Sequence, residues 1–342
     1  MTGTMCTRCV LPHAPPDILL DAEGVCNICR NYEAEERMGA LEDPLLETDF
    51  LKILDKHRGK QEYDCLCMLS GGKDSTAALY YVKQKYKLNP LVFTFNQGFV
   101  PDEHLDSARK TVDKLGVDWV YFETPFMKDM FRKIVQTRSK VVICGICSLW
   151  YMLKTYEIAA QFNVPIIISG WTKGQTTGSS RSVLSKCACD QNPEEFKAMS
   201  AATREFMDKH VRTDPKYRDF PYNMQDVMQI AKTQYKSKAV VLSPHWFVPG
   251  GPDEYVPVIK EKLGWDYPER SYPKKSTNCD LNFVASKLAV KNFGYSHYHI
   301  EMSNMIRLGV VTREEALEHL RMDYGDEVLG DILAKLDSRG MA

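Results

Sequence analysis

Residues 63–75, YDCLCMLSGGKDS, join a short apolar run to a Gly-Gly turn that carries serine, lysine and aspartate side chains. The apolar part, 63–69, is bounded by polar residues, and its length predicts a buried strand. The residues that follow, TAALYYVKQKY at 76–86, have the composition and spacing of a helix. The stretch therefore predicts a strand that turns tightly into a helix.

The same alternation continues along the chain. Further strands are predicted at 91–96, 119–124, 164–170 and 239–244, and helices at 104–116, 128–136 and 147–162. Strands that alternate with helices form a parallel sheet with helices on both faces. The expected fold class is α/β, a doubly wound parallel sheet, with an N-terminal zinc-ribbon module and a mainly helical C-terminal extension. In that extension, Thr312 and Glu315 have the spacing of a helix capping box.

The Gly-Gly turn has the chemistry of a phosphate-binding loop. Glycines let the backbone turn with its N–H groups exposed, and the helix N-terminus adds partial positive charge. Lys73 can contact phosphates, Asp74 can help to hold Mg²⁺, and two hydroxyl groups can donate hydrogen bonds. The whole loop is Ser70, Gly71, Gly72, Lys73, Asp74 and Ser75. The Walker spacing is absent, and an ordinary strand-to-helix turn is the alternative.

Four cysteines near the N-terminus are spaced as two C-x-x-C knuckles. They are Cys6, Cys9, Cys26 and Cys29. Two knuckles complete a tetrahedral Zn²⁺ site, and four sulfur ligands leave no open position for catalysis. Structural zinc is the favoured interpretation, and a bare thiol set or a redox-active cluster is the alternative.

The composition limits the class of protein. The 342 residues include 11 cysteines, and 44 basic against 45 acidic residues give a net charge of -1. An odd cysteine count without a signal-peptide pattern predicts reduced thiols in a cytoplasmic protein. No apolar stretch is long enough for a membrane span, and the charge balance offers no general grip on nucleic acid.

The motif Ser70-Gly71-Gly72-Lys73-Asp74-Ser75 resembles the SGGxDS signature of the PP-loop ATP pyrophosphatases. The resemblance implies a HUP-like fold and an enzyme that cleaves ATP to AMP and pyrophosphate while it adenylates a substrate oxygen. It implies that the loop grips the pyrophosphate and that Asp74 is catalytic. It also implies that Phe95, Asn96 and the loop after Gly170 flank the adenosine.

Most of the chain resembles the N-acetyl sugar amidotransferases. The shared features are the CTRCVLP and GVCNIC segments, the SGGKDS loop, the CGIC segment with VPIIISG, and the closing IRLGVVTREEAL, which contains Arg307. This resemblance implies conversion of an acetamido to an acetamidino group, with ammonia from a partner glutaminase. It leaves the oligomeric state open, a homodimer included.

The cysteine pattern also resembles the Fe-S-dependent tRNA thiolation enzymes. In those enzymes a C-x-x-C before a helix and one distant cysteine hold a 4Fe-4S cluster. The matching residues here are Cys144, Cys147 and Cys279, which we predict as catalytic residues and cluster ligands. The alternatives are a catalytic thiol pair without a cluster, or thiols with no chemical role.

The remaining cysteines carry weaker predictions. Cys65 and Cys67 are expected to be buried strand residues. The pair Cys187 and Cys189, with one residue between them, is too closely spaced for a standard metal knuckle, and its role stays open.

The leading hypothesis is an adenylating enzyme that replaces oxygen with sulfur, and nitrogen insertion into an N-acetyl sugar is the alternative. A non-catalytic nucleotide- or nucleic-acid-binding module is the third. The charge balance favours a small-molecule acceptor over tRNA, and the partner is a sulfur donor or a glutaminase. The expected domains are a four-cysteine zinc module at 1–34, the PP-loop domain at 58–245 and a substrate-binding helical region at 246–342.

Overall fold

The computed structural model describes residues 4–39, 45–175, 196–275 and 279–337. Its centre is a five-stranded parallel sheet with strand order β3-β2-β1-β4-β5. The strands are β1 (Cys65–Met68), β2 (Pro90–Asn96), β3 (Asp118–Glu123), β4 (Ile166–Ile168) and β5 (Val240–Leu242). The predicted α/β fold class is therefore confirmed.

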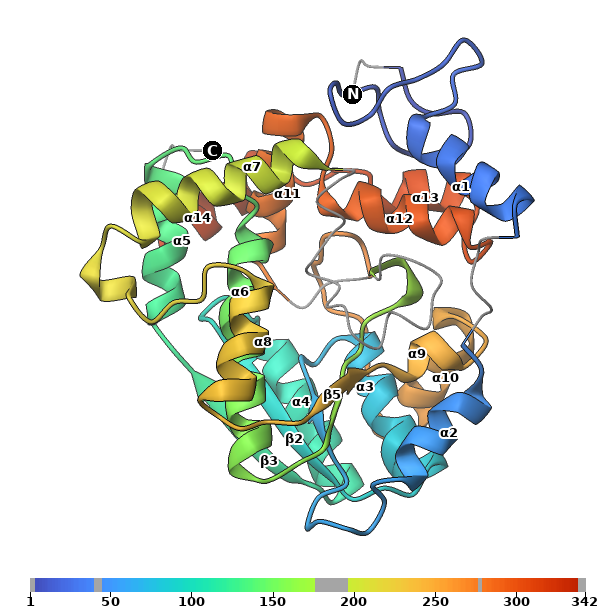
Figure 1. The fold of residues 1–342 in the computed structure, drawn as a ribbon, viewed down its shortest axis with the longest axis vertical. Helices are drawn as coiled ribbons and strands as arrows, with labels where there is room; N and C mark the ends of the chain where they lie inside the picture. Colours follow the sequence, from blue (N-terminus) through green and yellow to red (C-terminus); the bar gives the residue numbers. More distant parts are fainter. Residues whose placement is uncertain (1–3, 40–44, 176–195, 276–278, 338–342) are drawn as a thin grey trace.

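Helices surround the sheet and extend beyond it (Figure 1). They are α1 (Asn27–Arg37), α2 (Glu47–Asp55), α3 (Lys73–Tyr80), α4 (Asp102–Leu115), α5 (Phe126–Gln136), α6 (Ile143–Gln161), α7 (Lys197–Phe206), α8 (Met224–Thr233), α9 (Pro244–Phe247), α10 (Pro252–Leu263), α11 (Leu281–Phe293), α12 (His297–Arg307), α13 (Arg313–His319) and α14 (Asp326–Lys335). A short 3-10 helix, η2 (Lys173–Gln175), follows β4. None of the helices within the described ranges has both the length and the apolar character that a membrane span requires.

The sheet is covered on both faces because side chains alternate along each strand. On β1, Leu66 joins a core with α5, α6, α8, α11 and α14. Cys65 and Cys67 point the other way, into a core with α2, α3, α4, α9 and α10. Both cysteines are buried, as the sequence predicted.

The chain adds β2 and β3 on one side of β1 and then returns to add β4 and β5 on the other side. The order of the strands therefore reverses between β1 and β4 in the sheet. In doubly wound sheets, ligands bind at such a switch point, outside the carboxyl ends of the strands. The Gly-Gly turn follows β1, and Gly170 follows β4. The fold therefore brings these two loops to the same edge of the sheet.

Element boundaries differ from the sequence predictions in two informative places. Helix α6 begins at Ile143, four residues before the predicted start, so Cys144 lies in its first turn. The capping box of Thr312 and Glu315 is confirmed at the start of α13, but a further helix, α14, follows it. The proposed domain boundaries stay a prediction.

The N-terminal segment packs against the C-terminal helices rather than against the sheet. Figure 1 shows α1 close to α12 and α13. A small core joins Ile18 and Ile28 of this segment to Met199 of α7 and Ile300 of α12. The buried Tyr295 hydroxyl donates to Asp17, 3.1 Å away, which adds a polar anchor between the two ends of the chain.

Candidate active site and metal centre

The Gly-Gly turn is closed by its own hydroxyl groups. Ser70 Oγ lies 3.0 Å from Ser75 Oγ, and the Ser75 hydroxyl donates to the carbonyl oxygen of Gly72 at 3.1 Å. Gly71 has φ +81°, and a Cβ there would lie 2.2 Å from the His104 carbonyl oxygen. The tight turn therefore requires glycine at 71 on two independent grounds.

Residues from α9, α10 and the segment after them brace the loop from outside. The Trp265 indole donates to the carbonyl oxygen of Gly71 at 2.9 Å, and His245 Nε2 bonds to the carbonyl oxygen of Asp74 at 2.8 Å. The Tyr255 hydroxyl donates to the Asp74 carboxylate. These contacts fix the loop in the shape of a cradle before any phosphate binds.

The loop carries a buried ion pair. Lys73 Nζ lies 2.8 Å from an Asp74 carboxylate oxygen, and both side chains are mostly buried. Burial raises the pKa of Asp74, but the charge of Lys73 and the hydrogen bond from Tyr255 help to outweigh it and leave the pKa below its usual value. Asp74 is therefore ionised at neutral pH. A lysine and a carboxylate at a helix N-terminus fit the phosphates and Mg²⁺ of a bound nucleotide.

A cavity of about 300 Å³ opens beside the loop. Its wall combines polar groups of the loop with aromatic side chains and with three cysteines from distant parts of the sequence. The lining includes Ser70, Gly72, Asp74, Ser75, Phe93, Phe95, Gln97, Cys144, Cys147, Tyr151, Gly170, Trp171, Gln175, Cys279 and Asn282. The phosphate loop and the three cysteines therefore line one shared cavity.

The three cysteines Cys144, Cys147 and Cys279, called the cavity cysteines below, line one cavity because the first turn of α6 and the residues before α11 reach it. The Gln97 amide donates to Cys279 Sγ at 2.9 Å, and Cys144 Sγ donates to Asn282 Oδ1 at 3.3 Å. Burial raises the pKa of the Cys279 thiol to about 12. Neutral amides thus contact Cys279 and Cys144.

Comparison with known proteins agrees with this geometry. The family model described as queuosine biosynthesis protein QueC matches residues 64–145, which run from β1 through the loop to the first turn of α6. The matched part therefore includes the whole phosphate loop and the strands β1, β2 and β3. An uncharacterized protein of Methanocaldococcus jannaschii is 22% identical over 293 residues, which are 86% of this chain and 83% of the relative.

Solved structures with a distant likeness to this chain include two synthetases. The NH3-dependent NAD synthetase of Campylobacter jejuni is 15% identical, with a TM-score of 0.32 over 54% of this chain and 94% of its own. The NMN synthetase of Francisella tularensis is 14% identical, with a TM-score of 0.31 over 58% of this chain and 96% of its own. A predicted subunit of tRNA methyltransferase from Methanocaldococcus jannaschii is 13% identical, with a TM-score of 0.31 over 69% of this chain and 91% of its own. These likenesses are too distant to assign an acceptor.

The residues predicted to flank the adenosine of the PP-loop site have different surroundings. Phe95 lines the cavity and stacks on Phe122 at 5.7 Å between ring centroids. Gly170 also lines it, and a Cβ there would lie 2.5 Å from the Ser75 nitrogen. Asn96 instead donates from Nδ2 to the Tyr121 hydroxyl at 2.8 Å and accepts at Oδ1 from the Gly98 nitrogen at 2.8 Å, so both polar atoms of its side-chain amide hold the end of β2.

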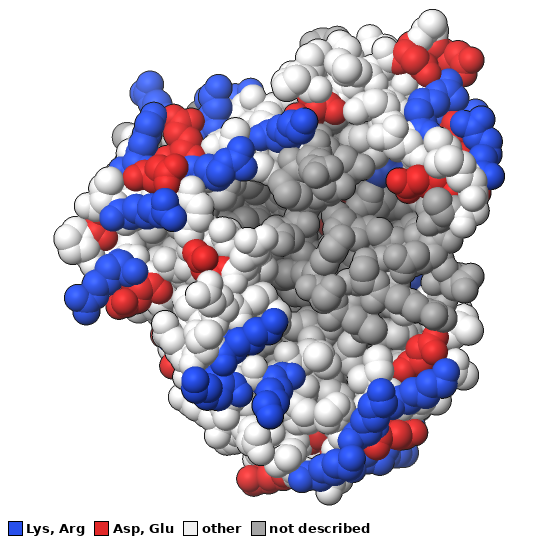
Figure 2. Space-filling model, in the orientation of Figure 1, with Lys and Arg blue, Asp and Glu red and all other residues white. Residues whose placement is uncertain are grey.

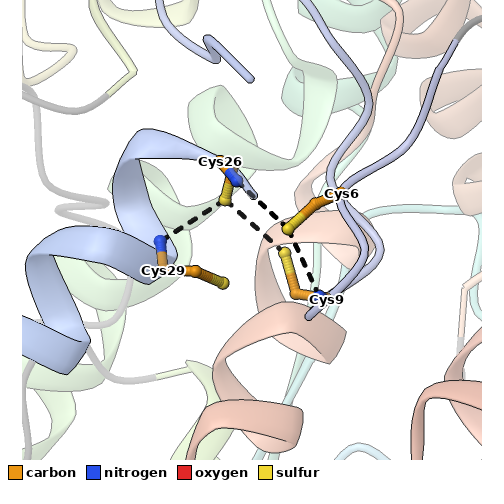
Figure 3. A group of neighbouring side chains, drawn as sticks. All are labelled: Cys6, Cys9, Cys26 and Cys29. Atoms are coloured by element: carbon orange, nitrogen blue, oxygen red, sulfur yellow. Dashed lines mark hydrogen bonds between the residues drawn. The ribbon is translucent and has the colours of Figure 1, made fainter. Parts of the chain in front are cut away.

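The four N-terminal cysteines form a compact buried group, the N-terminal cysteine cluster (Figure 3). Its members are Cys6, Cys9, Cys26 and Cys29, whose sulfur atoms all lie within 4.8 Å of one another. Across the described ranges, it is the one group of three or more His, Cys, Asp or Glu side chains that reaches this compactness. The spacing and the all-sulfur donor set fit one tetrahedral metal ion.

The electrostatics of this cluster favour a cation. Hydrogen bonds from Cys26 and Cys29 lower the pKa of the Cys9 thiol to about 7. The pKa of Cys26 is raised, because its thiol is hydrogen-bonded to the other sulfur atoms. One part of the cluster thus ionises readily, and the rest needs the charge of a bound metal to do so.

Several residues of the site gave no signal in the sequence. Gln97 directly follows the predicted strand 91–96, so the sequence indicated that it lies near the site. It did not indicate that the Gln97 amide contacts a cysteine. Tyr255 and Trp265 lie far along the chain and reach the loop only through tertiary packing. Two cysteines with an open role, Cys187 and Cys189, lie outside the described residues.

Proposed function

We propose that this protein uses ATP to adenylate an oxygen of a small-molecule acceptor and then replaces that oxygen with sulfur. The observation that supports it is the shared cavity, in which the phosphate loop and the cavity cysteines face the same space. The resemblance of the Gly-Gly turn to the PP-loop signature and the match of residues 64–145 to the QueC family model support the first half of the proposal, the adenylation. The second half rests on the position of the cysteines.

In the first step, the acceptor oxygen attacks the α-phosphorus of ATP and pyrophosphate leaves. The backbone N–H groups at the start of α3, with Lys73, would hold the β- and γ-phosphates and stabilise the negative charge of the leaving group. The ionised Asp74 would hold Mg²⁺ at the same phosphates. The closed shape of the loop means that little rearrangement is needed before reaction.

In the second step, a sulfur nucleophile attacks the activated carbon, and AMP leaves with the original oxygen. In this proposal the cavity cysteines, which line the same cavity as the phosphate loop, deliver or anchor that sulfur. Once deprotonated, Cys144, Cys147 and Cys279 would be the residues that hold a 4Fe-4S cluster, and the cluster would supply a binding site for sulfide. The amide group of Gln97 would orient Cys279 in either case.

Nitrogen insertion is the second candidate, and two features of the cavity cysteines favour it. Cys144 acts as a hydrogen-bond donor, and burial raises the pKa of Cys279 to about 12. Both are properties of protonated thiols without a chemical role. In this version ammonia, supplied by a partner glutaminase, attacks the activated carbon in place of sulfur.

The charge distribution favours a small acceptor in either version. The net charge is -1, and acidic and basic side chains are interspersed on the face shown in Figure 2. A protein that grips a folded tRNA needs a basic patch or stripe. We propose a neutral or modestly charged acceptor that carries an amide or carbonyl oxygen, and a zinc ion in the N-terminal cysteine cluster.

The deciding experiment is anaerobic purification followed by iron and sulfide analysis and by product mass measurement with candidate acceptors. Sulfur insertion predicts iron and sulfide in the protein and a product heavier than the acceptor. A colourless zinc-only protein that stays active in air and yields a lighter product would support nitrogen insertion instead. ATP binding without AMP formation across a broad acceptor set would leave a nucleotide-binding module.

A further inference from the structure

Helix α12 connects the N-terminal cysteine cluster to the active-site cavity. At its C-terminal end, the Arg307 guanidinium donates to Cys29 Sγ at 3.6 Å. The same guanidinium donates to Asn304 Oδ1, one turn earlier, at 2.5 Å. Arg307 therefore couples the position of a cluster sulfur to the side chain of Asn304.

The other end of Asn304 holds the short helix η2. Asn304 Nδ2 donates to the carbonyl oxygen of Gly174 at 3.0 Å. Gly174 has no room for a side chain, because a Cβ there would lie 2.4 Å from Met305 Cγ and 2.8 Å from the carbonyl oxygen of Glu301. Helix α12 and η2 are thus closely packed at Gly174.

A second pair of contacts, from the middle of α12, fixes the residues around Gly174. Thr172 Oγ1 donates to Glu301 Oε1 at 3.2 Å, and the Gln175 amide donates to Glu301 Oε2 at 3.4 Å. Gln175 and Trp171 line the cavity. The segment that α12 holds is therefore part of the cavity wall.

We propose that Arg307 and Asn304 are positioning residues that couple metal binding in the N-terminal cysteine cluster to ATP affinity at the phosphate loop. The coupling runs from Cys29 through Arg307 and Asn304 to the carbonyl oxygen of Gly174. From η2 it continues to Gly170, whose backbone touches Ser75 of the loop. In this proposal the N-terminal cysteine cluster stabilises its own segment and also affects nucleotide binding at the phosphate loop.

The physical basis is the restraint that a bound metal places on sulfur. A metal ion fixes the position of Cys29 Sγ, so Arg307 keeps one orientation and presents Asn304 to η2. Without the ion, Cys29 is held only by weaker contacts to its neighbours, and the restraint on η2 is relaxed. A looser cavity wall lowers the fraction of molecules that are ready to bind nucleotide.

The test compares metal-loaded and metal-free protein in the wild type and in Asn304→Asp, using titration calorimetry with Mg-ATP. An aspartate at 304 can still accept from Arg307 but cannot donate to the Gly174 carbonyl oxygen. In the wild type we expect metal removal to weaken ATP binding by roughly 10-fold. Metal-loaded Asn304→Asp should already be weaker by roughly 5- to 10-fold, with little further loss on metal removal.

Two further arginine variants separate this coupling from simple docking of the N-terminal segment. Arg307→Gln should keep its metal but show the same ATP defect as Asn304→Asp, with faster amide hydrogen exchange in 172–175. Arg313→Gln removes bonds to the carbonyl oxygens of Cys9 and Cys6, which hold the segment but do not lead to η2. It should change ATP affinity by less than about 2-fold.

Two results would overturn the proposal. One is an ATP affinity in the wild type that does not depend on metal. The other is an Asn304→Asp protein that keeps the full metal dependence and wild-type exchange rates in η2. Because the readouts are nucleotide binding, metal content and amide exchange, the outcome does not depend on whether sulfur or nitrogen is inserted.

Discussion

The N-terminal cysteine cluster and the cavity cysteines place the same kind of side chain in two different arrangements. In the cluster, four buried sulfur atoms lie within 4.8 Å of one another and exclude other ligands. The cavity cysteines share a space of about 300 Å³ with the phosphate loop, and neutral amides contact two of them. The first arrangement is compact enough to hold one small ion, and the second leaves room for a reactant.

This difference shows that convergence of cysteines does not by itself indicate their role. Compactness and burial favour structural metal, because every coordination position is filled by protein. An open arrangement beside a nucleotide loop favours chemistry, because it leaves access for a substrate. The two groups should therefore respond differently to substitution, and the experiments below test that difference.

The largest effect is expected for Cys26→Ser in the N-terminal cysteine cluster. Loss of one sulfur ligand should release the metal and remove most of a binding energy that is on the order of 10 kcal/mol in small zinc modules. The segment at 4–39 should unfold and the rest of the chain should lose stability. Thermal denaturation and metal analysis measure this, and an unchanged melting temperature would show that the cluster is not structural.

The second largest effect is expected for Gly170→Ala in the wall of the cavity. A Cβ at 170 would lie 2.5 Å from the nitrogen and 2.6 Å from the Cα of Ser75, so the phosphate loop must shift. Pyrophosphate release from ATP should fall by roughly 100-fold, as expected when reacting groups move by about 1 Å. Gly330→Ala in α14 is the matched control. A Cβ at 330 would have no atom within 4 Å outside the backbone of its own helix, so the variant should be neutral or slightly stabilising. Equal activity of the two variants would contradict the close approach.

Cys279→Ser tests the chemistry of the cavity cysteines directly. We expect its stability to change by about 1 kcal/mol or less and product formation to fall by at least roughly 100-fold. The control is Cys65→Ala in β1, which should lose about 1 kcal/mol of stability and keep its activity. If Cys279→Ser keeps full product formation, sulfur insertion through this thiol is wrong and nitrogen insertion becomes the favoured function.

The smallest effect is a pH dependence near the cavity. Burial raises the pKa of Glu301 to about 7, although the charge of Lys73 opposes this. A carboxyl group whose pKa is higher in the folded state stabilises the fold most below its unfolded value of 4.5. That contribution is lost as the pH rises from 4.5 through about 7, and it is on the order of 1 to 3 kcal/mol.

Glu301→Gln should flatten this part of the stability profile, which denaturant titration at several pH values can measure. Metal release from the N-terminal cysteine cluster should run the other way and increase as the pH falls, because protons compete for the thiolates. Opposite pH responses would sharpen the contrast between the two regions. An unchanged slope in Glu301→Gln would assign the titration to another group.

Much of this molecule follows from local patterns in its sequence. The strand before the Gly-Gly turn, the alternation of strands and helices and the two C-x-x-C knuckles all depend on near neighbours in the chain. Cys144 and Cys279 line the same cavity, but only the resemblance in cysteine pattern, and no local signal around either residue, suggested that they share a site. Their chemical role stays a prediction.

The rest depends on contacts between residues that are distant in sequence. No local pattern indicates that Trp265 donates to Gly71 or that Tyr255 bonds to Asp74, since each pairing is created by the packing of α10 and the segment after it. The raised pKa of Glu301 likewise comes from burial, which a single helical glutamate in the sequence does not reveal. Sequence patterns identify the loop, and tertiary packing determines its surroundings.

The anchoring of the first segment to the last helices has a consequence for biosynthesis. Arg313 bonds to the carbonyl oxygen of Cys9, which lies 304 positions earlier in the chain. During translation, the N-terminal segment can bind its metal early, but its docking surface on α12 and α13 is made last. The closing of this long loop is therefore expected to be a late event in folding, after the sheet has formed. Until then the N-terminal segment lacks its contacts with α12 and α13, and a ribosome that stalls before α12 would leave the surface that makes them exposed.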